Sequence, residues 1–311
     1  MTTQPEQTVA TYDSSVTGQP GDLTKRPPGW GGELAARYGL ASISARPGLR
    51  TYLSQVWARR HFLVAFSNAR MVSLYSRTRL GQLWQLLTPL LNAGVYLLLF
   101  GVLLNTSRGV DNFVAFLVIG VFIFNFTQRA VRQGADSVSS NLGLLRALHF
   151  PRATLPLAYT LTELQQFFGA LVVMTTVVLL TGEPITWSWL LVPVAVALQS
   201  VFNAGAALIA ARVVAQAPDV NKVLPFFLRT WLYMSGVFYS IQVHADRFPE
   251  WLRVVLEVNP GAVYIDLVRR ALLTEHVPLP YSWPLAVVWA VVALVVGFVF
   301  FWRAETSYGR G

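Results

Sequence analysis

The sequence contains no cysteine. This absence excludes disulfide bridges, thiolate catalysis, and zinc or iron–sulfur sites built on cysteine ligands. It also means that cysteine usage gives no information about the redox compartment of the protein.

Charged residues are scarce as well. They make up 13% of the 311 residues, whereas soluble proteins carry about a quarter. Hydrophobic residues make up 54% of the chain, and the mean hydropathy is +0.49. A chain of this length could form about two soluble domains, but this composition indicates one bundle solvated by lipid.

Only two lysines are present, Lys25 and Lys222, and neither completes a G-x-x-x-x-G-K-[ST] phosphate-binding loop. If transport is driven by ATP, the ATPase, with its ATP and Mg²⁺, must therefore reside in another chain. The four histidines are scattered, with no H-E-x-x-H and no D-x-D pattern. General acid–base and metal catalysis need convergent groups, so we expect no metal, no cofactor and no catalytic residues in this chain.

Long stretches with few or no charges dominate the rest of the sequence. A helix that crosses a bilayer needs about 20 mostly apolar residues, and the stretches are too long and too uniform for barrel strands. The sequence therefore predicts an all-α integral membrane protein with six transmembrane helices. These lie within residues 80–107, 112–128, 153–182, 184–211, 223–245 and 276–302.

The segments around this six-helix permease domain (80–303) differ in composition. Residues 1–50 are polar and rich in Gly, Pro, Ser and Thr, which is typical of a disordered tail; they show no signal-peptide pattern. Residues 51–79 combine helically spaced apolar side chains with arginines, which predicts an amphipathic helix in the headgroup plane. Residues 304–311 form a short C-terminal segment.

The distribution of basic residues predicts the orientation. If the N-terminus is cytoplasmic, 18 of the 24 lysines and arginines fall in cytoplasmic segments and five in outer ones. The positive-inside rule then places both termini of this plasma-membrane protein in the cytoplasm. This distribution also accounts for the net charge of +9, so we expect no nucleic-acid partner.

Residues 246–274, on the predicted outer side, do not have the composition of a simple loop. An amphipathic run from Pro249 ends at Asn259-Pro260-Gly261, and a second run carries Tyr264 and Leu272 on one apolar face. We expect two half-length helices that dip into the outer leaflet before the last span.

A short helix is predicted at residues 139–150, between the second and third spans. Ser139 and Asn141 are good N-cap residues, and Pro151 forces the helix to stop. Leu142, Leu145 and His149 share one face. Sequence physics alone leaves open whether this helix rests on lipid or docks a cytosolic partner.

Two segments resemble the ABC-2 permease family, in particular its polysaccharide-exporting branch. The first is Tyr75-Ser76-Arg77-Thr78-Arg79-Leu80-Gly81-Gln82-Leu83-Trp84 with Pro89, which leads into the first span. The second is Asn259-Pro260 followed by Tyr264, Arg269-Arg270 and Leu272-Leu273. The resemblance covers about residues 52–303. In the connection after the fourth span, where the family often has Arg-Asp, only Asp219 corresponds.

The resemblance implies a homodimer in the bacterial plasma membrane with two ABC ATPase subunits docked on its cytoplasmic side. Its implied cargo is a polysaccharide, such as O-antigen, teichoic acid or galactan, on a polyprenyl pyrophosphate carrier. The Ala-, Val- and Arg-rich composition indicates a high-GC organism and favours an actinobacterial cell-wall galactan. The residues expected to couple the chain to the ATPase are Leu142, Leu145, Arg146, Leu148, His149 and Asp219.

Three further residue sets are candidates for roles in transport. Aromatic residues of the second and fifth spans could stack on sugar rings or simply pack; they are Phe113, Phe116, Phe124, Phe227, Trp231, Tyr233, Phe238 and Tyr239. Arginines at the cytoplasmic headgroup level could bind the pyrophosphate or anchor the protein on membrane lipids; they are Arg59, Arg60, Arg77 and Arg79. Glu163 and Arg229, the isolated charges of the third and fifth spans, lie at similar depths and are expected to pair, unless each is accommodated separately.

Two other functions remain open at this stage. One is an ABC-2 exporter of a drug or a small lipid. The other is a membrane-embedded enzyme that modifies a glycan, which the lack of convergent ionisable groups disfavours.

Overall fold

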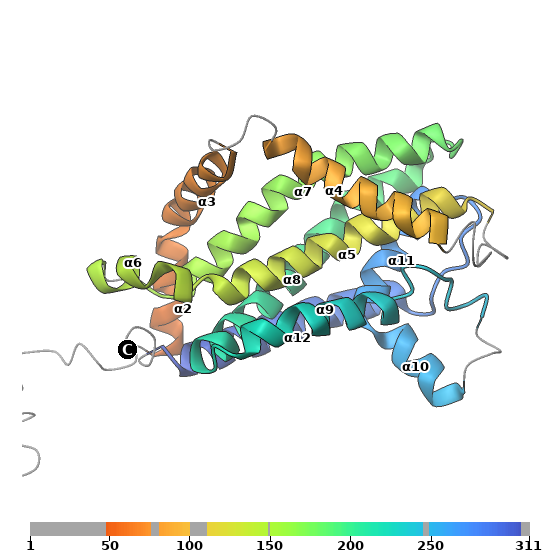
Figure 1. Cartoon of the computed structure of the whole chain (residues 1–311). Helices are drawn as coiled ribbons and strands as arrows, with labels where there is room; N and C mark the ends of the chain where they lie inside the picture. The colour runs from red at the N-terminus through yellow and green to blue at the C-terminus, as the bar shows by residue number, and fades with distance from the viewer. Residues whose placement is uncertain (1–47, 76–80, 100–110, 149, 245–248, 306–311) are drawn as a thin grey trace, which may run out of the picture. The chain divides into compact units, whose positions relative to one another are not determined.

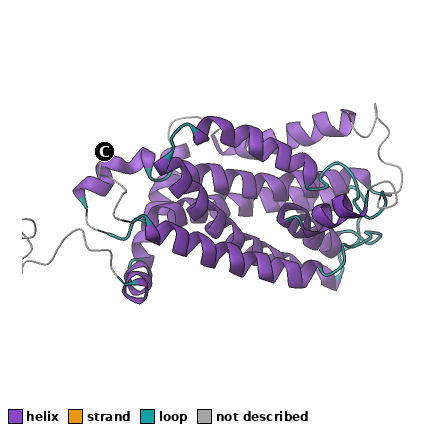
Figure 2. Cartoon of the chain, turned by 90° about the horizontal axis from the view of Figure 1, so that it is seen from below, coloured by secondary structure: helices purple, strands orange, loops and turns teal. Residues whose placement is uncertain are grey.

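The computed structural model describes residues 48–75, 81–99, 111–148, 150–244 and 249–305 (Figure 1). Within these ranges the chain forms eleven α-helices and two short 3-10 helices, with no strand (Figure 2). The predicted all-helical fold is therefore confirmed. Most of the predicted N-terminal tail (1–50) and of the C-terminal segment (304–311) lies outside the described residues.

The helices follow one another in a simple order along the chain. They are α2 (Leu49–Ala58), α3 (Arg60–Tyr75), α4 (Gly81–Tyr96), α5 (Phe113–Asp136), η4 (Ser139–Asn141), α6 (Leu142–Ala147), α7 (Thr154–Leu180), η5 (Trp187–Leu191), α8 (Val192–Gln216), α9 (Val220–Met234), α10 (Glu250–Val258), α11 (Pro260–Leu272) and α12 (Ser282–Arg303). We call the end of the bundle that carries α2 and α6 the α6 end, and the opposite end the α10 end (Figure 1).

Four helices of the described part are long and apolar enough to cross a membrane: α5, α7, α8 and α12. The sequence predicted six spans, and the other two correspond to shorter helices. α4 has 16 residues and α9 has 15; at ~1.5 Å rise per residue, α9 covers only about 22 Å of a hydrocarbon core of roughly 30 Å. The fifth stretch (223–245) is not one continuous helix, since α9 ends at Met234 and Gly236 takes a positive φ of 63°.

α5 is the central helix of the bundle. It packs against α7 and α8 and also contacts α4, α9 and α11. Nearly all of its side chains from Phe113 to Phe126 are buried, as expected for a helix that is apolar on every side. The main core is built around α5, with contributions from α7, α8, α11 and α12.

α8 and α12 form another intimate pair. A Cβ atom at Gly205 of α8 would lie 2.2 Å from the carbonyl group of Ala293 in α12, and one at Gly297 would lie 2.3 Å from the Gly205 carbonyl oxygen. Glycine is therefore required at both positions, because the two backbones touch directly. Such small-residue contacts are typical of helix pairs in membranes.

The predicted interfacial helix of residues 51–79 is divided into α2 and α3 at Arg59. Two side chains of α2, Tyr52 and Val56, are buried in a second core with Leu155 of α7 and Phe298 of α12. The outer face of α2 carries Trp57, which is 71% exposed. Trp57 is followed by the exposed arginines Arg59 and Arg60, and an exposed tryptophan beside arginines is typical of a helix at a membrane surface.

Polar contacts fasten α2 to the far end of the chain. The Tyr52 hydroxyl donates to Glu305 Oε2 at 2.6 Å and accepts from the Ala153 backbone N–H at 3.1 Å. Glu305 Oε1 accepts from the Arg152 backbone N–H at 3.0 Å. Burial raises the pKa of the Glu305 carboxyl, although its hydrogen bonds with Arg152 and Tyr52 and the Arg152 charge oppose this effect.

This network predicts a pH-dependent stability of the α6 end. Because the Glu305 pKa is raised in the folded state, its contribution to stability is present below its ordinary unfolded pKa and is lost as the pH rises through the raised value. In Glu305→Gln the amide oxygen can still accept from Arg152 N–H and the NH₂ can donate to Tyr52. We expect the thermal unfolding midpoint of the detergent-solubilised protein to fall with rising pH. The fall should be steeper for the wild type than for Glu305→Gln. Identical pH slopes for the two proteins would contradict this role of Glu305.

Candidate functional site

The most unusual part of the bundle is the non-helical segment that follows α9. Residues 235–244 form turns, yet Val237, Phe238 and Ile241 are almost completely buried. Backbone N–H and C=O groups at membrane depth need partners, and non-helical backbone is tolerated there only where protein shields it. The structure supplies those partners from α11.

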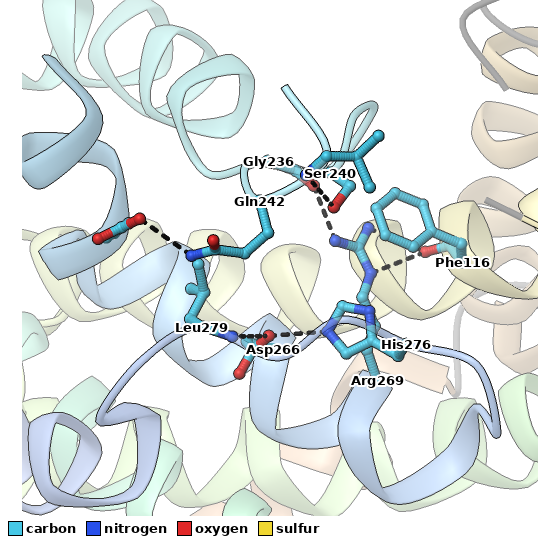
Figure 3. A network of polar contacts seen from close by, with 10 residues as sticks. Phe116, Gly236, Ser240, Gln242, Asp266, Arg269, His276 and Leu279 are labelled. Atoms are coloured by element: carbon cyan, nitrogen blue, oxygen red, sulfur yellow. Dashed lines mark hydrogen bonds and ion pairs between the residues drawn. The ribbon is translucent and has the colours of Figure 1, made fainter. Parts of the chain in front are cut away.

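Arg269 of α11 is 4% exposed and reaches into this segment. Its guanidinium donates to the carbonyl of Gly236 at 2.8 Å, to that of Val237 at 2.9 Å, and to that of Phe116 at 2.9 and 3.1 Å (Figure 3). It also lies 3.2 Å from the centre of the Phe116 ring. Gly120 leaves the necessary room, since a Cβ there would lie 2.6 Å from Arg269 Nη2. One side chain thus joins α5, α11 and the end of α9.

Asn259 performs a similar function at the start of α11. Its Oδ1 accepts from Gly261 N–H at 3.0 Å and from Trp231 Nε1 at 2.7 Å, and its Nδ2 donates to the Met234 carbonyl at 3.0 Å. It therefore caps α11 and also satisfies the last turn of α9. Gly261 permits this close approach, because a Cβ there would lie 2.3 Å from Ser235 Oγ.

A buried acid and a buried histidine hold the connection between α11 and α12. His276 Nε2 lies 2.7 Å from Asp266 Oδ1, and the Leu279 N–H donates to the same oxygen at 3.0 Å (Figure 3). Both side chains are less than 8% exposed. This contact closes the connection against α11 next to Arg269.

A cavity of about 640 Å³ opens at the α10 end beside this network. Its lining includes Phe116, His276 and three acids, Asp111, Glu183 and Glu275. A hydrogen bond with Asp111 and repulsion from Asp111 and Glu183 raise the pKa of the Glu275 carboxyl. The mouth of this cavity is therefore acidic and polar.

The predicted coupling residues gather at the α6 end, but they are not equally accessible. Leu142 and Leu148 are 38% and 50% exposed, whereas Leu145 is 7% exposed and belongs to the core shared with Tyr52. Arg146 is exposed, and His149 lies outside the described residues. The structure therefore divides the predicted docking face: Leu145 packs into this core, whereas Leu142 and Leu148 remain accessible.

Asp219 lies at the same end. It is exposed and pairs with Lys222 at 3.0 Å. The start of α9 is fixed to α5 by a 2.5 Å hydrogen bond from Asn221 Nδ2 to Asp136 Oδ1, while the Asp136 carbonyl accepts from Ser140 of η4 at 2.6 Å. Asp136 thus holds the start of α9 and the segment leading into α6 together.

The predicted channel aromatics fall into two groups. The rings of α5 (Phe113, Phe116 and Phe124), together with Phe238, are buried in the core. Phe113 and Phe116 also border the cavity at the α10 end. On α9, Phe227 is 59% and Tyr233 is 44% exposed. Trp231 and Tyr239 are partly buried, and Trp231 is engaged by Asn259.

The predicted pyrophosphate arginines are only partly within the described chain. Arg59 and Arg60 are exposed; Arg60 donates to the Trp57 carbonyl at 3.5 Å and lies 5.8 Å from the Trp57 ring centre. Arg77 and Arg79 lie outside the described residues.

The structure does not support the predicted pair of Glu163 and Arg229. Both residues are described, and no ion pair joins them. The cations that act on buried Glu163 are Arg129 and Arg70, whereas Arg229 is exposed and acts on Tyr96 of α4. α7 and α9 each pack on α5 rather than on one another. Equal depth in the membrane did not specify which helices are neighbours.

The sequence did not predict a site role for Asn259, Arg269 or Arg70. A signal was available for Arg269: it stands next to Arg270 in a mostly apolar run (Ala262–Leu273) whose other charged residue is Asp266, and buried arginines in membrane segments need acceptors. No sequence pattern indicated that those acceptors would be carbonyls of the broken fifth span.

Replacing Arg269 should weaken the whole α10 end. In Arg269→Met the carbonyls of Gly236, Val237 and Phe116 lose their donors, so we expect a loss of about 3–5 kcal/mol of folding free energy. The measurement is the thermal unfolding midpoint in detergent, with recovery of monodisperse protein as a second readout. Arg270→Met is the matched control, since Arg270 is exposed and should change stability by less than about 0.5 kcal/mol. Equal stability of the two variants would contradict the structural role of Arg269.

Comparison with known proteins identifies the family of the chain. Residues 63–273 match the family model described as ABC-2 type transporter. The chain is 27% identical over 254 residues to the O-antigen export system permease protein RfbA of Myxococcus xanthus, covering 82% of this chain and 94% of that protein.

Two other relatives are more distant. The RfbA permease of Klebsiella pneumoniae is 23% identical over 205 residues, covering 65% of this chain and 76% of that protein. The polysialic acid transport protein KpsM of Escherichia coli is 22% identical over 243 residues, covering 75% and 89%. In such systems the permease is a transport subunit, and the ATPase activity lies in separate subunits. Since the family model covers more than half of its length, this chain belongs to the ABC-2 type transporter family.

Proposed function

We propose that this chain is the membrane-spanning subunit of an exporter that moves a lipid-linked polysaccharide across the bacterial inner membrane. The observation that carries the proposal is the ABC-2 family match over residues 63–273, together with relatives named for O-antigen export and polysialic acid transport. A separate ABC ATPase, with ATP and Mg²⁺, supplies the energy. The chain itself contributes the path for the cargo.

In this proposal the chain crosses the membrane six times. α5, α7, α8 and α12 cross as full-length helices. α4, which continues as a π-helical turn through residues 97–99, and α9 provide the other two crossings. The shortfall of α9 is made up by residues 235–244: Arg269 donates to the carbonyls of Gly236 and Val237 in this segment, and Asn259 donates to Met234 at the end of α9. The excess of arginines at the α6 end supports placing that end, and both termini, in the cytoplasm.

We infer that two copies of the chain enclose the transport path between the exposed faces of α4 and α9. These faces carry large side chains that remain exposed in the described part of the chain, among them Leu91 and Val95 of α4 and Phe226, Phe227 and Tyr233 of α9. Flat rings can stack on sugar faces without tight hydrogen bonds, so a long glycan can slide past them. The aromatic residues of α5 have no such role in this proposal, since they are buried.

The cargo proposed here carries a polyprenyl pyrophosphate at one end and a cell-wall galactan-type glycan at the other. Arg59 and Arg60, with Arg77 and Arg79, are the candidates for the pyrophosphate. Exposed guanidiniums on α2 and at the start of α3 would meet such a headgroup at the cytoplasmic surface. The galactan assignment rests on composition, and the pyrophosphate assignment on the family resemblance.

Coupling to the ATPase should depend on exposed leucines of the α6 segment. We expect Leu142→Asp combined with Leu148→Asp to reduce stimulation of the ATPase at least about tenfold, because charged groups would replace apolar anchors in the docking surface. The measurement is ATP hydrolysis and co-purification with the ATPase in reconstituted membranes.

Leu145→Asp distinguishes docking from folding. Since Leu145 is buried in the core with Tyr52, this variant should lower the yield of folded protein. Undiminished co-purification and stimulation by the Leu142→Asp/Leu148→Asp protein would refute the assignment of α6.

The path for the glycan can be tested on α9. Phe227→Ala combined with Tyr233→Ala should slow export several-fold and trap lipid-linked glycan in the cytoplasmic leaflet, because two stacking platforms are lost. Export is measured as glycan accessible to an enzyme added outside the cell. Phe168→Ala is the control, since Phe168 is 55% exposed on α7, away from the proposed path. Equal export by both variants would exclude α9 as the lining, and loss of glycan synthesis in isolated membranes would indicate an enzyme instead.

A further inference from the structure

A polar cavity of about 400 Å³ lies at the α6 end, apart from the proposed transport path. Four helices contribute to it. Its lining consists of Arg70 of α3, Gln133 and Asp136 of α5, Ser139 and Ser140 of η4, and Tyr159 of α7. The export proposal assigns no role to the cavity.

Arg70 is fixed in place inside this cavity. Its Nη2 donates to Gln133 Oε1 at 2.8 Å, and its guanidinium carbon lies 3.6 Å from the centre of the Tyr159 ring. Its Nε is buried and has no acceptor within the described part of the chain. Because Arg70 as a whole is only half-buried, its guanidinium keeps donors for a ligand in the cavity, and a planar guanidinium fork fits the oxygens of a phosphate. Arg70 therefore suits an oxygen-bearing anion.

The Tyr159 hydroxyl is held by two residues of the η4 segment. It accepts from Asn141 Nδ2 at 2.7 Å and donates to Ser140 Oγ at 3.1 Å, because the Ser140 proton is already given to the Asp136 carbonyl. Tyr159 thus fixes the position of the guanidinium that lies against its ring, and Arg70 is the donor that remains for a ligand.

Asp136 places a negative charge in the same cavity. One of its oxygens accepts from Asn221 at 2.5 Å. Arg70 and Asp136 line one cavity, yet in the described chain no ion pair joins them. A purely anionic ligand would be repelled by Asp136. The two opposite charges, held apart, fit a ligand that carries a phosphate and a cation a few bonds apart.

The surroundings of the cavity favour an amphiphile. Leu74 follows Arg70 by one helical turn on the same face of α3 and is 42% exposed, and neighbouring Val72 is 69% exposed. Apolar side chains beside a polar cavity suit a molecule whose headgroup enters the cavity and whose tail follows the helix.

We propose that this cavity binds the headgroup of a zwitterionic phospholipid, with its phosphate on Arg70 and its primary ammonium on Asp136. The lipid is a resident ligand of the α6 end and not the exported cargo. Phosphatidylethanolamine has this chemistry, whereas phosphatidylglycerol has the phosphate without the ammonium.

The test is lipid binding to the purified full-length protein by native mass spectrometry in detergent. We expect dioleoyl-phosphatidylethanolamine to bind about tenfold more tightly than dioleoyl-phosphatidylglycerol. Arg70→Gln should weaken binding of the ethanolamine lipid about tenfold, and Asp136→Asn, which can still accept from Asn221, should abolish the preference between the two lipids. Arg132→Gln is the control, since Arg132 is exposed on the same end of α5 and does not line the cavity.

Each contrary result overturns a defined part of the proposal. Equal binding of the two lipids by the wild type would remove the ammonium site at Asp136. Displacement of the ethanolamine lipid by farnesyl pyrophosphate would assign the cavity to the cargo headgroup. Displacement by the purified ATPase would assign it to that partner. If Arg70→Gln is unstable, Arg70→Lys, which keeps the charge but not the fork, should still show weakened binding.

Discussion

The contact between the Arg269 guanidinium and three backbone carbonyls is the interaction on which the rest of the structure depends. Gly236 and Val237 lie where α9 has already ended, and their carbonyls would otherwise be unpaired at membrane depth. By satisfying them, Arg269 allows a crossing to be completed by a turn instead of a helix. Asn259 acts in the same way on Met234. The short α9, the buried turn and the half-helices α10 and α11 are therefore one structural solution and not separate irregularities.

This arrangement also accounts for the division of aromatic residues. Because α5 is surrounded by helices and by the segment that Arg269 fixes, its phenylalanines are part of the core. α9 is held mainly by its buried leucines, Leu224, Leu228 and Leu232, and by its final turn. Its other side remains exposed, with Phe226, Phe227 and Tyr233. A helix fixed along one face and at one end is suited to present a surface to a second copy of the chain and to cargo.

Hydropathy and the positions of helix-starting and helix-stopping residues predicted much of this fold: the helical class, the amphipathic N-terminal region, the short helix before Pro151 and the helix start at Asn259-Pro260. Properties that depend on rotation about a helix axis could not be predicted in this way. Leu145 turned out to face the core, and Glu163 lies near Arg129 and Arg70 instead of Arg229. The same limit applies to the site, since Arg269 and Arg70 acquire their roles from acceptors and rings contributed by α5, α7 and the turn after α9. These contacts join segments that are far apart in the sequence, so no local sequence pattern indicates them.

The contact between α8 and α12 has a mechanical consequence. At Gly205 and Gly297 the two backbones touch with no side chains between them. Sliding one helix along the other would drive a main chain into a main chain, because no rotamer change could relieve the overlap. We infer that α8 and α12 move as one rigid unit. Any rearrangement during a transport cycle must then occur between other helices. The short helices α4 and α9, with their exposed faces, are the parts of the bundle least constrained against such movement.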